Sequence, residues 1–306
     1  MVGYASAVLV FHCDRHVLTL PPGHRFPESK YRLLREKLLE LRLVDPASLR
    51  DAEPAPIEAI LRAHDEDYVE AVLRGQLGPA GERAVGFPWS QSLVARTLAS
   101  VGGTMLASRA ALRDGIAGAL AGGTHHAFRD RGEGYCVFND LAVAIRDLQV
   151  DGSIRRALVV DLDVHQGNGT ASIFAGDESV FTFSMHGARN FPFEKERSSR
   201  DVNLPDGCGD TEYLDTLGRH LPEVIEAARP DIVFFQAGVD PLQGDSLGRL
   251  ALTHGGLRAR DRMVLEAAWG RGVPAVITLG GGYAKPIERS VEAHAGTYAV
   301  AREVCR

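Results

Sequence analysis

The chain has 306 residues, of which 45% are hydrophobic and 24% charged, and its formal net charge is −6. This composition is typical of an ordinary soluble globular protein, and no lysine- or arginine-rich run predicts a nucleic-acid-binding patch. The four cysteines have no CxxC spacing, which excludes a zinc finger and a secreted disulfide framework. The apolar run Tyr4–Phe11 is too short for a signal sequence or a membrane span. We therefore expect a cytoplasmic protein without membrane contact.

Short β-branched runs alternate along the chain with longer helical patterns. The predicted strands are Ala7–Phe11, Gly118–Ala121, Arg156–Asp161, Val180–Ser184, Asp231–Gln236 and Ala275–Leu279. The predicted helices are Glu28–Leu41, Ser90–Arg113, Asn139–Leu148, Thr211–Ala228, Gly256–Gly270 and Lys285–Arg302. This alternation favours a parallel sheet covered by helices on both sides. Since no change of composition follows the linker-like stretch Gly75–Phe87, we expect one domain over residues 1–306.

Acidic residues and a histidine follow two of these strands. Asp161, Asp163 and His165 alternate along an extended segment, so their side chains point to one side. Burying them unpaired would be costly, and a divalent cation would remove that cost. A hydrogen-bonded, aspartate-rich turn is the alternative. Asp240 follows the strand Asp231–Gln236, and Asp163, His165 and Asp240 together would leave a position open, as catalytic zinc sites do.

Two adjacent histidines, His125 and His126, follow the strand Gly118–Ala121. A neutral imidazole can take a proton from a zinc-bound water near pH 7 when a partner fixes its other nitrogen. Asp161 and Asn168 are the candidate partners. For this dipeptide alone, two exposed loop histidines are the alternative.

A glycine turn ends the last predicted strand. Gly280, Gly281 and Gly282 allow the backbone to approach a ligand closely, and the hydroxyl of Tyr283 could meet a developing oxyanion. Alone, this motif has little predictive value.

Taken together, these motifs resemble the histone deacetylase family in order and spacing. The matches are His125-His126, the DxDxHxGxG run Asp161–Gly169, AGVD ending at Asp240, GGGY ending at Tyr283, Phe26–Glu28 followed by Arg32, Gly134–Asp140, and Gly244–Gly248. They span nearly the whole chain. The resemblance implies the arginase/deacetylase fold, a three-layer α/β/α domain around a central, mostly parallel sheet of about eight strands.

The resemblance also implies a role for each site residue. The implied zinc ligands are Asp163, His165 and Asp240, and the implied catalytic residues are His125, His126, Asp161, Asn168 and Tyr283. In such a site His126 activates the zinc-bound water, His125 is its partner held by Asp161, and Tyr283 stabilises the oxyanion with zinc.

The family's substrate channel and second metal are implied in the same way. The implied substrate-binding residues are Gly134, Tyr135, Phe191, Gly281 and Gly282. Tyr135 and Phe191 would sandwich the aliphatic stem of a lysine, although both could be ordinary core aromatics. Family members also hold a structural potassium ion. Its ligands here would be the backbone carbonyls of Asp161, Asp163, His165 and Met185 and the hydroxyl of Ser184.

Three departures from the family pattern stand out. Gln166 replaces a histidine of many members, as in the class IV branch and its bacterial relatives. Asn168 replaces an aspartate, so His126 should be less basic than it would be beside a carboxylate. The rim aspartate that binds the substrate backbone in class I members has no clear match. Gly86–Ser90 lies in that region, and Trp89 lines the mouth or sits in the core.

We therefore expect a zinc-dependent amidohydrolase that acts on acyl-lysine in proteins or peptides, or on small acylated amines. An acetylpolyamine amidohydrolase and a long-chain fatty-acyl lysine deacylase are the alternatives within this chemistry. A binuclear manganese ureohydrolase would need more carboxylates, and a non-enzymatic scaffold would need a broken base or a lost tyrosine. Outside the site, we expect local hydrogen bonds for His64 and solvent exposure for His220 and His294.

Overall fold

The computed structural model describes residues 8–306, and their strands form one eight-stranded sheet in the order β2-β1-β3-β8-β7-β4-β5-β6. The strands are β1 (Leu9–His12), β2 (Leu49–Asp51), β3 (Ile116–Ala119), β4 (Ala157–Asp161), β5 (Val180–Gly187), β6 (Arg200–Leu204), β7 (Ile232–Gln236) and β8 (Ala275–Thr278). All the strand pairings are parallel. The expected, mostly parallel sheet is therefore confirmed.

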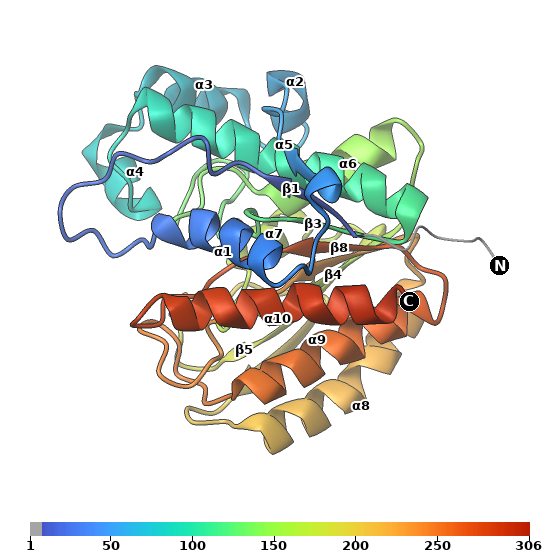
Figure 1. Ribbon diagram of the computed structural model, residues 1–306. Helices are drawn as coiled ribbons and strands as arrows, with labels where there is room; N and C mark the ends of the chain where they lie inside the picture. Colours follow the sequence, from blue (N-terminus) through green and yellow to red (C-terminus); the bar gives the residue numbers. More distant parts are fainter. Residues whose placement is uncertain (1–7) are drawn as a thin grey trace.

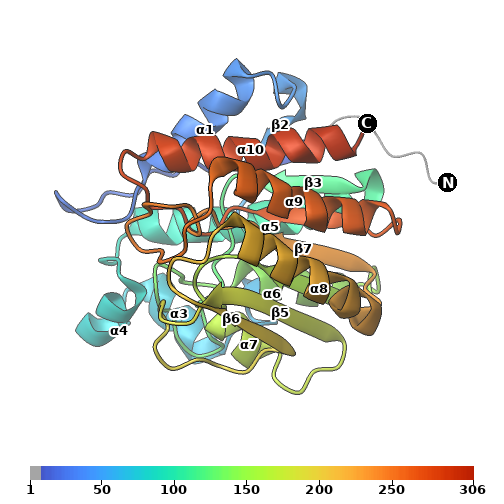
Figure 2. The same ribbon diagram turned by 90° about the horizontal axis from the view of Figure 1, so that it is seen from below.

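Helices cover both faces of this sheet, which gives three layers (Figures 1 and 2). The helices are α1 (Ser29–Glu40), α2 (Ile57–Ile60), α3 (Glu66–Arg74), α4 (Gly78–Val85), α5 (Gln91–Asp114), α6 (Asp140–Val150), α7 (Asn168–Ile173), α8 (Asp210–Ala228), α9 (His254–Trp269) and α10 (Glu288–Val304). α8, α9 and α10 cover one face with α1 against α10, and α5 and α6 cover the other. Within the described part of the chain, no helix is long and apolar enough to cross a membrane.

The central strands lie in the core of the molecule. Every residue of β4 and β7 is buried, as expected for apolar strands with helices on both faces. Thr253 caps α9 by accepting the N–H of Gly256, so this helix begins where its sequence signal predicts.

Several elements at the periphery differ from the sequence-based expectation. β2 and β6 were not predicted, because both are short edge strands with exposed or half-buried polar residues. The linker-like stretch contains α4, which has a proline in its first turn and ends at Gly86 in a left-handed conformation. Ala7, the first residue of the first predicted strand, lies outside the described residues.

Three of the histidines outside the predicted site also differ from expectation. His64 is buried, and its Nε2 accepts the N–H of Asn139, far away in sequence rather than local. His294 is 0% exposed, because α10 is packed against both α1 and α9. His220 is half-buried and lies 3.2 Å from the Arg200 guanidinium.

Candidate active site

The predicted motifs meet at one edge of the sheet because they follow four adjacent strands. β3, β8, β7 and β4 are neighbours in the sheet, and all are parallel. Their carboxyl ends lead into the segment containing His125 and His126, the glycine turn before Tyr283, Asp240, and the Asp163–His165 segment, respectively. Ligands bind at such carboxyl ends in open α/β sheets. The topology thus brings together residues that are far apart in sequence.

Asp163, His165 and Asp240 form a compact buried cluster. Their candidate ligand atoms all lie within 4.8 Å of one another. His165 Nδ1 is 3.0 Å from Asp163 Oδ1 and 3.0 Å from Asp240 Oδ2. Asp240 Oδ2 has no well-aligned hydrogen bond within the described residues. Two carboxylates and one imidazole that converge on one point fit a divalent metal such as zinc, with a coordination position left open.

The electrostatics of the cluster also favour a cation. Burial and the neighbouring Asp163 carboxylate raise the pKa of Asp240 to about 7. Burial lowers the pKa of His165, but attraction to Asp240 and Asp163 outweighs it and raises this pKa to about 10. The two carboxylates therefore strongly favour positive charge between them.

Backbone groups hold the remaining carboxylate oxygens in place. Asp240 Oδ1 accepts the N–H of Val164 at 2.8 Å, and Asp163 Oδ2 accepts the N–H of Gly281 at 2.7 Å. A Cβ at Gly281 would lie 1.9 Å from Asp240 Oδ2, so this close approach requires glycine. Two cavities meet at the cluster, an outer channel that opens to the surface and an inner cavity behind it. Gly281, predicted to bind substrate, supports the cluster and also lines the inner cavity. Gly282 packs instead against Val239 and lines neither cavity.

The two histidines form a buried pair with ring centroids 4.1 Å apart. His125 Nδ1 lies 2.7 Å from Asp161 Oδ2. Burial lowers the pKa of His125, but the Asp161 and Asp163 carboxylates raise it to about 9. We infer that His125 carries a positive charge at neutral pH and that its Nδ1–H donates a hydrogen bond to Asp161 Oδ2.

His126 has a different partner and a different charge state. Its Nδ1 lies 2.7 Å from Asn168 Oδ1, and Asn168 Nδ2 donates to Glu133 Oε2 at 3.3 Å. This orientation of the amide makes His126 Nδ1 the donor, which leaves Nε2 as a free acceptor. Burial, together with the His125 and His165 rings, holds the pKa of His126 well below its usual value. His126 is therefore neutral at neutral pH, and burial and the neighbouring rings are the causes.

A channel of about 680 Å³ leads to these groups from the surface. Gly134, Tyr135, Phe191 and Tyr283 line it, together with Arg83–Gly86 at the end of α4. The ring of Phe191 meets that of His126 edge-on, with centroids 5.0 Å apart. The predicted channel residues therefore lie together.

Tyr283 is positioned through its backbone. Its N–H donates to Asp245 Oδ2 at 2.6 Å, and its ring centroid is 6.2 Å from that of Tyr135. Burial and the Asp240 carboxylate raise the pKa of the Tyr283 phenol well above its usual value. The hydroxyl therefore stays protonated at neutral pH and can donate a hydrogen bond.

Three supporting residues were not assigned roles from the sequence. Asp140 accepts the N–H groups of Gly123 and Thr124 and so fixes the segment before the histidine pair. Asp245 fixes Tyr283, as described above. Asp140 and Asp245 lie in the motifs Gly134–Asp140 and Gly244–Gly248, which resemble the family. Their place in these motifs was the sequence feature that could have identified them.

The third supporting residue is Gln166, whose position was noted only as a departure from the family pattern. Its buried amide donates to the Glu196 carbonyl at 2.6 Å and to Asp201 Oδ1 at 2.8 Å, and it accepts the N–H of Glu196 at 2.9 Å. Gln166 thus ties the charged 194–200 loop to the site. Trp89 lies away from the channel, with its indole N–H donated to the Val72 carbonyl.

Of the predicted potassium ligands, Asp161 ends β4, Ser184 and Met185 lie on the neighbouring β5, and Asp163 and His165 are in the segment after β4. Asp161 is the register partner of Ser184, and Ser184 and Met185 are buried. The Ser184 hydroxyl lies 2.9 Å from His186 Nδ1.

Comparison with known proteins identifies a matching family and several similar chains. A family model described as the histone deacetylase domain matches residues 24–298. A protein of Picosynechococcus sp. is 46% identical over 97% of this chain and 98% of its own length. A probable deacetylase of Methanothermobacter thermautotrophicus is 35% identical over 90% of this chain and 86% of its own. The crystal structure of a histone deacetylase homologue complexed with SAHA matches with a TM-score of 0.80 at 27% identity, over 98% of this chain and 84% of that chain.

Proposed function

The chain belongs to the histone deacetylase family and has the arginase/deacetylase fold, and from this premise we propose that it hydrolyses the amide of acyl-lysine with a zinc ion. Asp163, His165 and Asp240 would hold the ion. The observation that carries the proposal is that Asp163 and His165 of this cluster, the His125–His126 pair and Tyr283 line one cavity, with Asp240 buried 3.0 Å from His165. Asn168, which holds His126, completes the catalytic set.

The mechanism follows from the charge states of the side chains. When bound, zinc would act as a Lewis acid on the amide carbonyl and lower the pKa of the attacking water. His126 is neutral, so its Nε2 takes the proton of that water. The Tyr283 hydroxyl donates a hydrogen bond to the oxyanion. The histidine pair then returns a proton to the leaving amine, and a free amine and a carboxylic acid are released.

The channel fits a lysine side chain as the amine portion of the substrate. Tyr135 and Phe191 lie on its walls, and Gly134 brings the backbone close to His126. A cavity continues inward from the site as far as Leu93 and Val101. Its reach beyond the metal cluster favours, as a second candidate, a deacylase for acyl groups longer than acetyl. Small acylated amines, including acetylpolyamines, remain alternative substrates.

The proposal has three further parts. A structural potassium ion would bind between β4 and β5, at the backbone carbonyls of Asp161, Asp163, His165 and Met185 and the Ser184 hydroxyl. Gln166 supports a place near the class IV branch. The four cysteines of the chain are all free and buried, which is consistent with the reducing environment of the cytoplasm.

Steady-state assays of the zinc-loaded protein would test this function. The substrates are acetyl-, butyryl-, octanoyl- and myristoyl-lysine peptides, beside acetylated polyamines. We expect turnover of one acyl-lysine class, with kcat lower by about 10²- to 10³-fold in Tyr283→Phe because one oxyanion donor is lost. Turnover of polyamines alone would identify the alternative substrate. An absence of hydrolysis across the panel, with zinc still bound, would contradict the proposal.

A further inference from the structure

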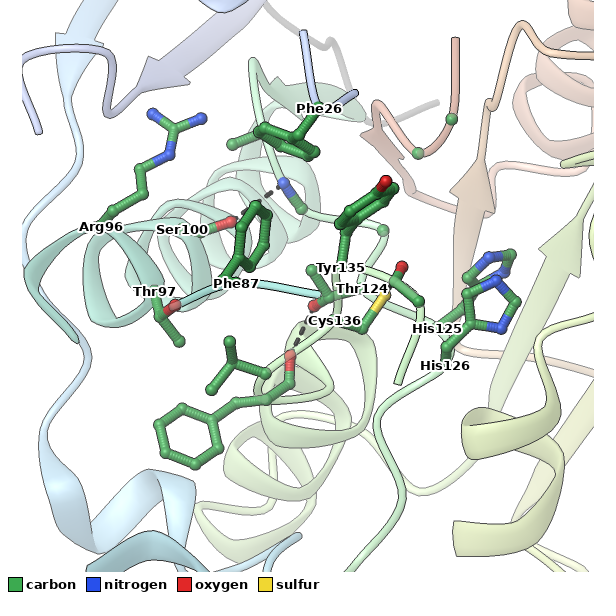
Figure 3. Close-up of a pocket in the computed structure, with 18 of the residues that line it drawn as sticks. Phe26, Phe87, Arg96, Thr97, Ser100, Thr124, His125, His126, Tyr135 and Cys136 are labelled. Atoms are coloured by element: carbon green, nitrogen blue, oxygen red, sulfur yellow. Dashed lines mark hydrogen bonds between the residues drawn. The ribbon is translucent and has the colours of Figure 1, made fainter. Parts of the chain in front are cut away.

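The inner cavity connects the reaction site to a distant part of helix α5. At one end it is lined by His125, His126 and Tyr283, and at the other by Arg96 and Thr97 of α5 (Figure 3). Its intervening walls include the apolar side chains of Leu18, Phe26, Phe87, Leu93 and Val101, beside the hydroxyls of Ser100 and Thr124. A group attached to the carbonyl carbon at the metal cluster would therefore extend along apolar walls toward Arg96.

Arg96 has a charge without a counter-ion. Arg96 is only 7% exposed, and no carboxylate among the described residues lies within 4.0 Å of its guanidinium. Its Nη1 has no hydrogen-bond partner in the same part of the chain. The ring of Tyr31 lies 4.2 Å from the guanidinium carbon. Tyr31 thus contacts the guanidinium through its ring and also takes part in a side-chain hydrogen bond with it, but the N–H groups on the buried Nη1 still need an acceptor.

The other buried cations in the described chain have acceptors. Arg260 pairs with the carboxylate of Asp261 at 2.7 Å and donates to two backbone carbonyls. Lys30 donates to the Gly280 carbonyl at 3.2 Å. An unpaired buried charge is costly, and Arg96 alone among these three faces a cavity large enough for a ligand.

We propose that Arg96 binds a carboxylate at the inner end of this cavity. The inference rests on the proposed function, because the ligand reaches Arg96 from the metal cluster. A guanidinium binds a carboxylate through two parallel N–H···O bonds, and the apolar walls would hold a short aliphatic chain. The carboxylate belongs either to an acyl group with a carboxyl at its far end or to the free acid released by hydrolysis.

Matched pairs of substrates would distinguish these two sources. The pairs are succinyl-, glutaryl- and adipoyl-lysine peptides against butyryl-, pentanoyl- and hexanoyl-lysine peptides, each assayed with zinc-loaded wild type and Arg96→Met. For a carboxyl-ended acyl group, Arg96→Met lowers the ratio of kcat/KM between carboxyl-ended and methyl-ended substrates by about 10- to 100-fold, the loss typical of a charged hydrogen bond. Arg113→Met removes an exposed arginine from the same helix and should leave the ratio unchanged.

Inhibition by free butyrate tests the second source. If Arg96 binds the released acid, the inhibition constant of butyrate rises by about 10-fold or more in Arg96→Met, while the ratio of kcat/KM between carboxyl-ended and methyl-ended substrates stays constant. If neither quantity differs between wild type and Arg96→Met, the proposal is overturned. Conservative replacement in Arg96→Lys should restore part of whichever effect is seen, since it returns the charge without the paired donors.

Failure of the proposed function would be visible separately. If the wild type hydrolyses no acyl-lysine peptide while zinc is bound, calorimetric titration with butyrate and glutarate still tests the site. Weaker binding of these acids to zinc-loaded Arg96→Met than to wild type would support the carboxylate site alone. Equal binding to both proteins would overturn it.

Discussion

At the scale of single residues, the channel wall has no room for a side chain at Gly134. Gly134 has φ +55°, and a Cβ at this position would lie 2.8 Å from His126 Cδ2 and 3.2 Å from Phe191 Cε1. We expect Gly134→Ala to displace the base and lower kcat/KM on an acyl-lysine peptide by at least about 10-fold, since small misplacements of catalytic groups are costly. Steady-state kinetics would measure this.

Gly152→Ala is the matched control for this change. Gly152 has a similar left-handed φ of +77°, but a Cβ there would meet nothing within 4 Å. Both variants place alanine at a positive φ, so Gly152→Ala measures the effect of backbone strain without the steric contact that Gly134→Ala adds. Only Gly134→Ala should lose activity. Equal activity in the two variants would show that the contact with His126 has no catalytic consequence.

The buried His64 predicts a pH dependence of stability at the residue scale. Burial lowers its pKa from 6.5 to about 4, so the folded state keeps it neutral while the unfolded state binds a proton below pH 6.5. Stability contributed by neutral His64 is therefore complete above pH 6.5 and is lost as the pH falls toward 4. The slope for one such group is about 1.4 kcal/mol per pH unit.

Urea unfolding at several pH values would measure this contribution. His64→Gln keeps an acceptor for the Asn139 N–H but does not titrate. The difference in unfolding free energy between wild type and His64→Gln should shrink by about 2 kcal/mol from pH 6.5 to 5. A difference that stays constant across this range would show that His64 does not titrate as its burial predicts.

At the scale of elements, α9 joins the two segments that carry the candidate metal ligands after β4 and β7. The buried Arg260 on α9 donates to the carbonyls of Leu162 and Gly238, which follow β4 and β7 and precede Asp163 and Asp240. Arg260→Met would leave the buried Asp261 carboxylate without its partner, and breaking such a pair costs about 3–5 kcal/mol. We expect a loss of this size in urea unfolding of the metal-free protein, with weaker zinc binding in chelator competition.

Arg262→Met is the control on the same helix, because Arg262 forms only exposed ion pairs with Glu266 and Glu303. Exposed pairs contribute about 0–1 kcal/mol. If Arg260→Met costs no more than Arg262→Met, or if zinc affinity is unchanged, the link between α9 and the two metal-bearing segments is wrong.

Elements near the site were easier to predict than those at the edges. β4 and β7 are apolar up to their last residues, Asp161 and Gln236, so the strands and the polar residues that follow them are visible in the sequence. β6 has the sequence RDVNL and pairs only with β5, so neither hydrophobicity nor alternation marks it. The order β3-β8-β7-β4 depends on tertiary packing. The meeting of Asp163, His165 and Asp240 was predicted from their positions after strands, whereas the roles of the remaining motifs were inferred through the family resemblance. Arg96 was not identified, because an arginine in a helical pattern predicts exposure.

At the scale of the whole molecule, the metal cluster exists only when the sheet is formed. Asp163 and His165 follow β4, whereas Asp240 follows β7, and the two strands are held together by parallel pairing. A metal that binds only the folded state stabilises it by mass action. Zinc at 100 times its dissociation constant should therefore raise the unfolding free energy by about 2.7 kcal/mol.

Urea unfolding in chelator and in buffered zinc would measure this increment for wild type and Asp240→Asn. Removing the carboxylate leaves two ligands from one segment, so most of the increment should disappear in the variant. Asp67→Asn changes an exposed aspartate in the first turn of α3 and should retain the full increment. An increment of equal size in Asp240→Asn would place the zinc elsewhere on the protein. Asp240 is the one ligand of the candidate cluster that follows β7, so a metal bound there must bind more weakly without its carboxylate.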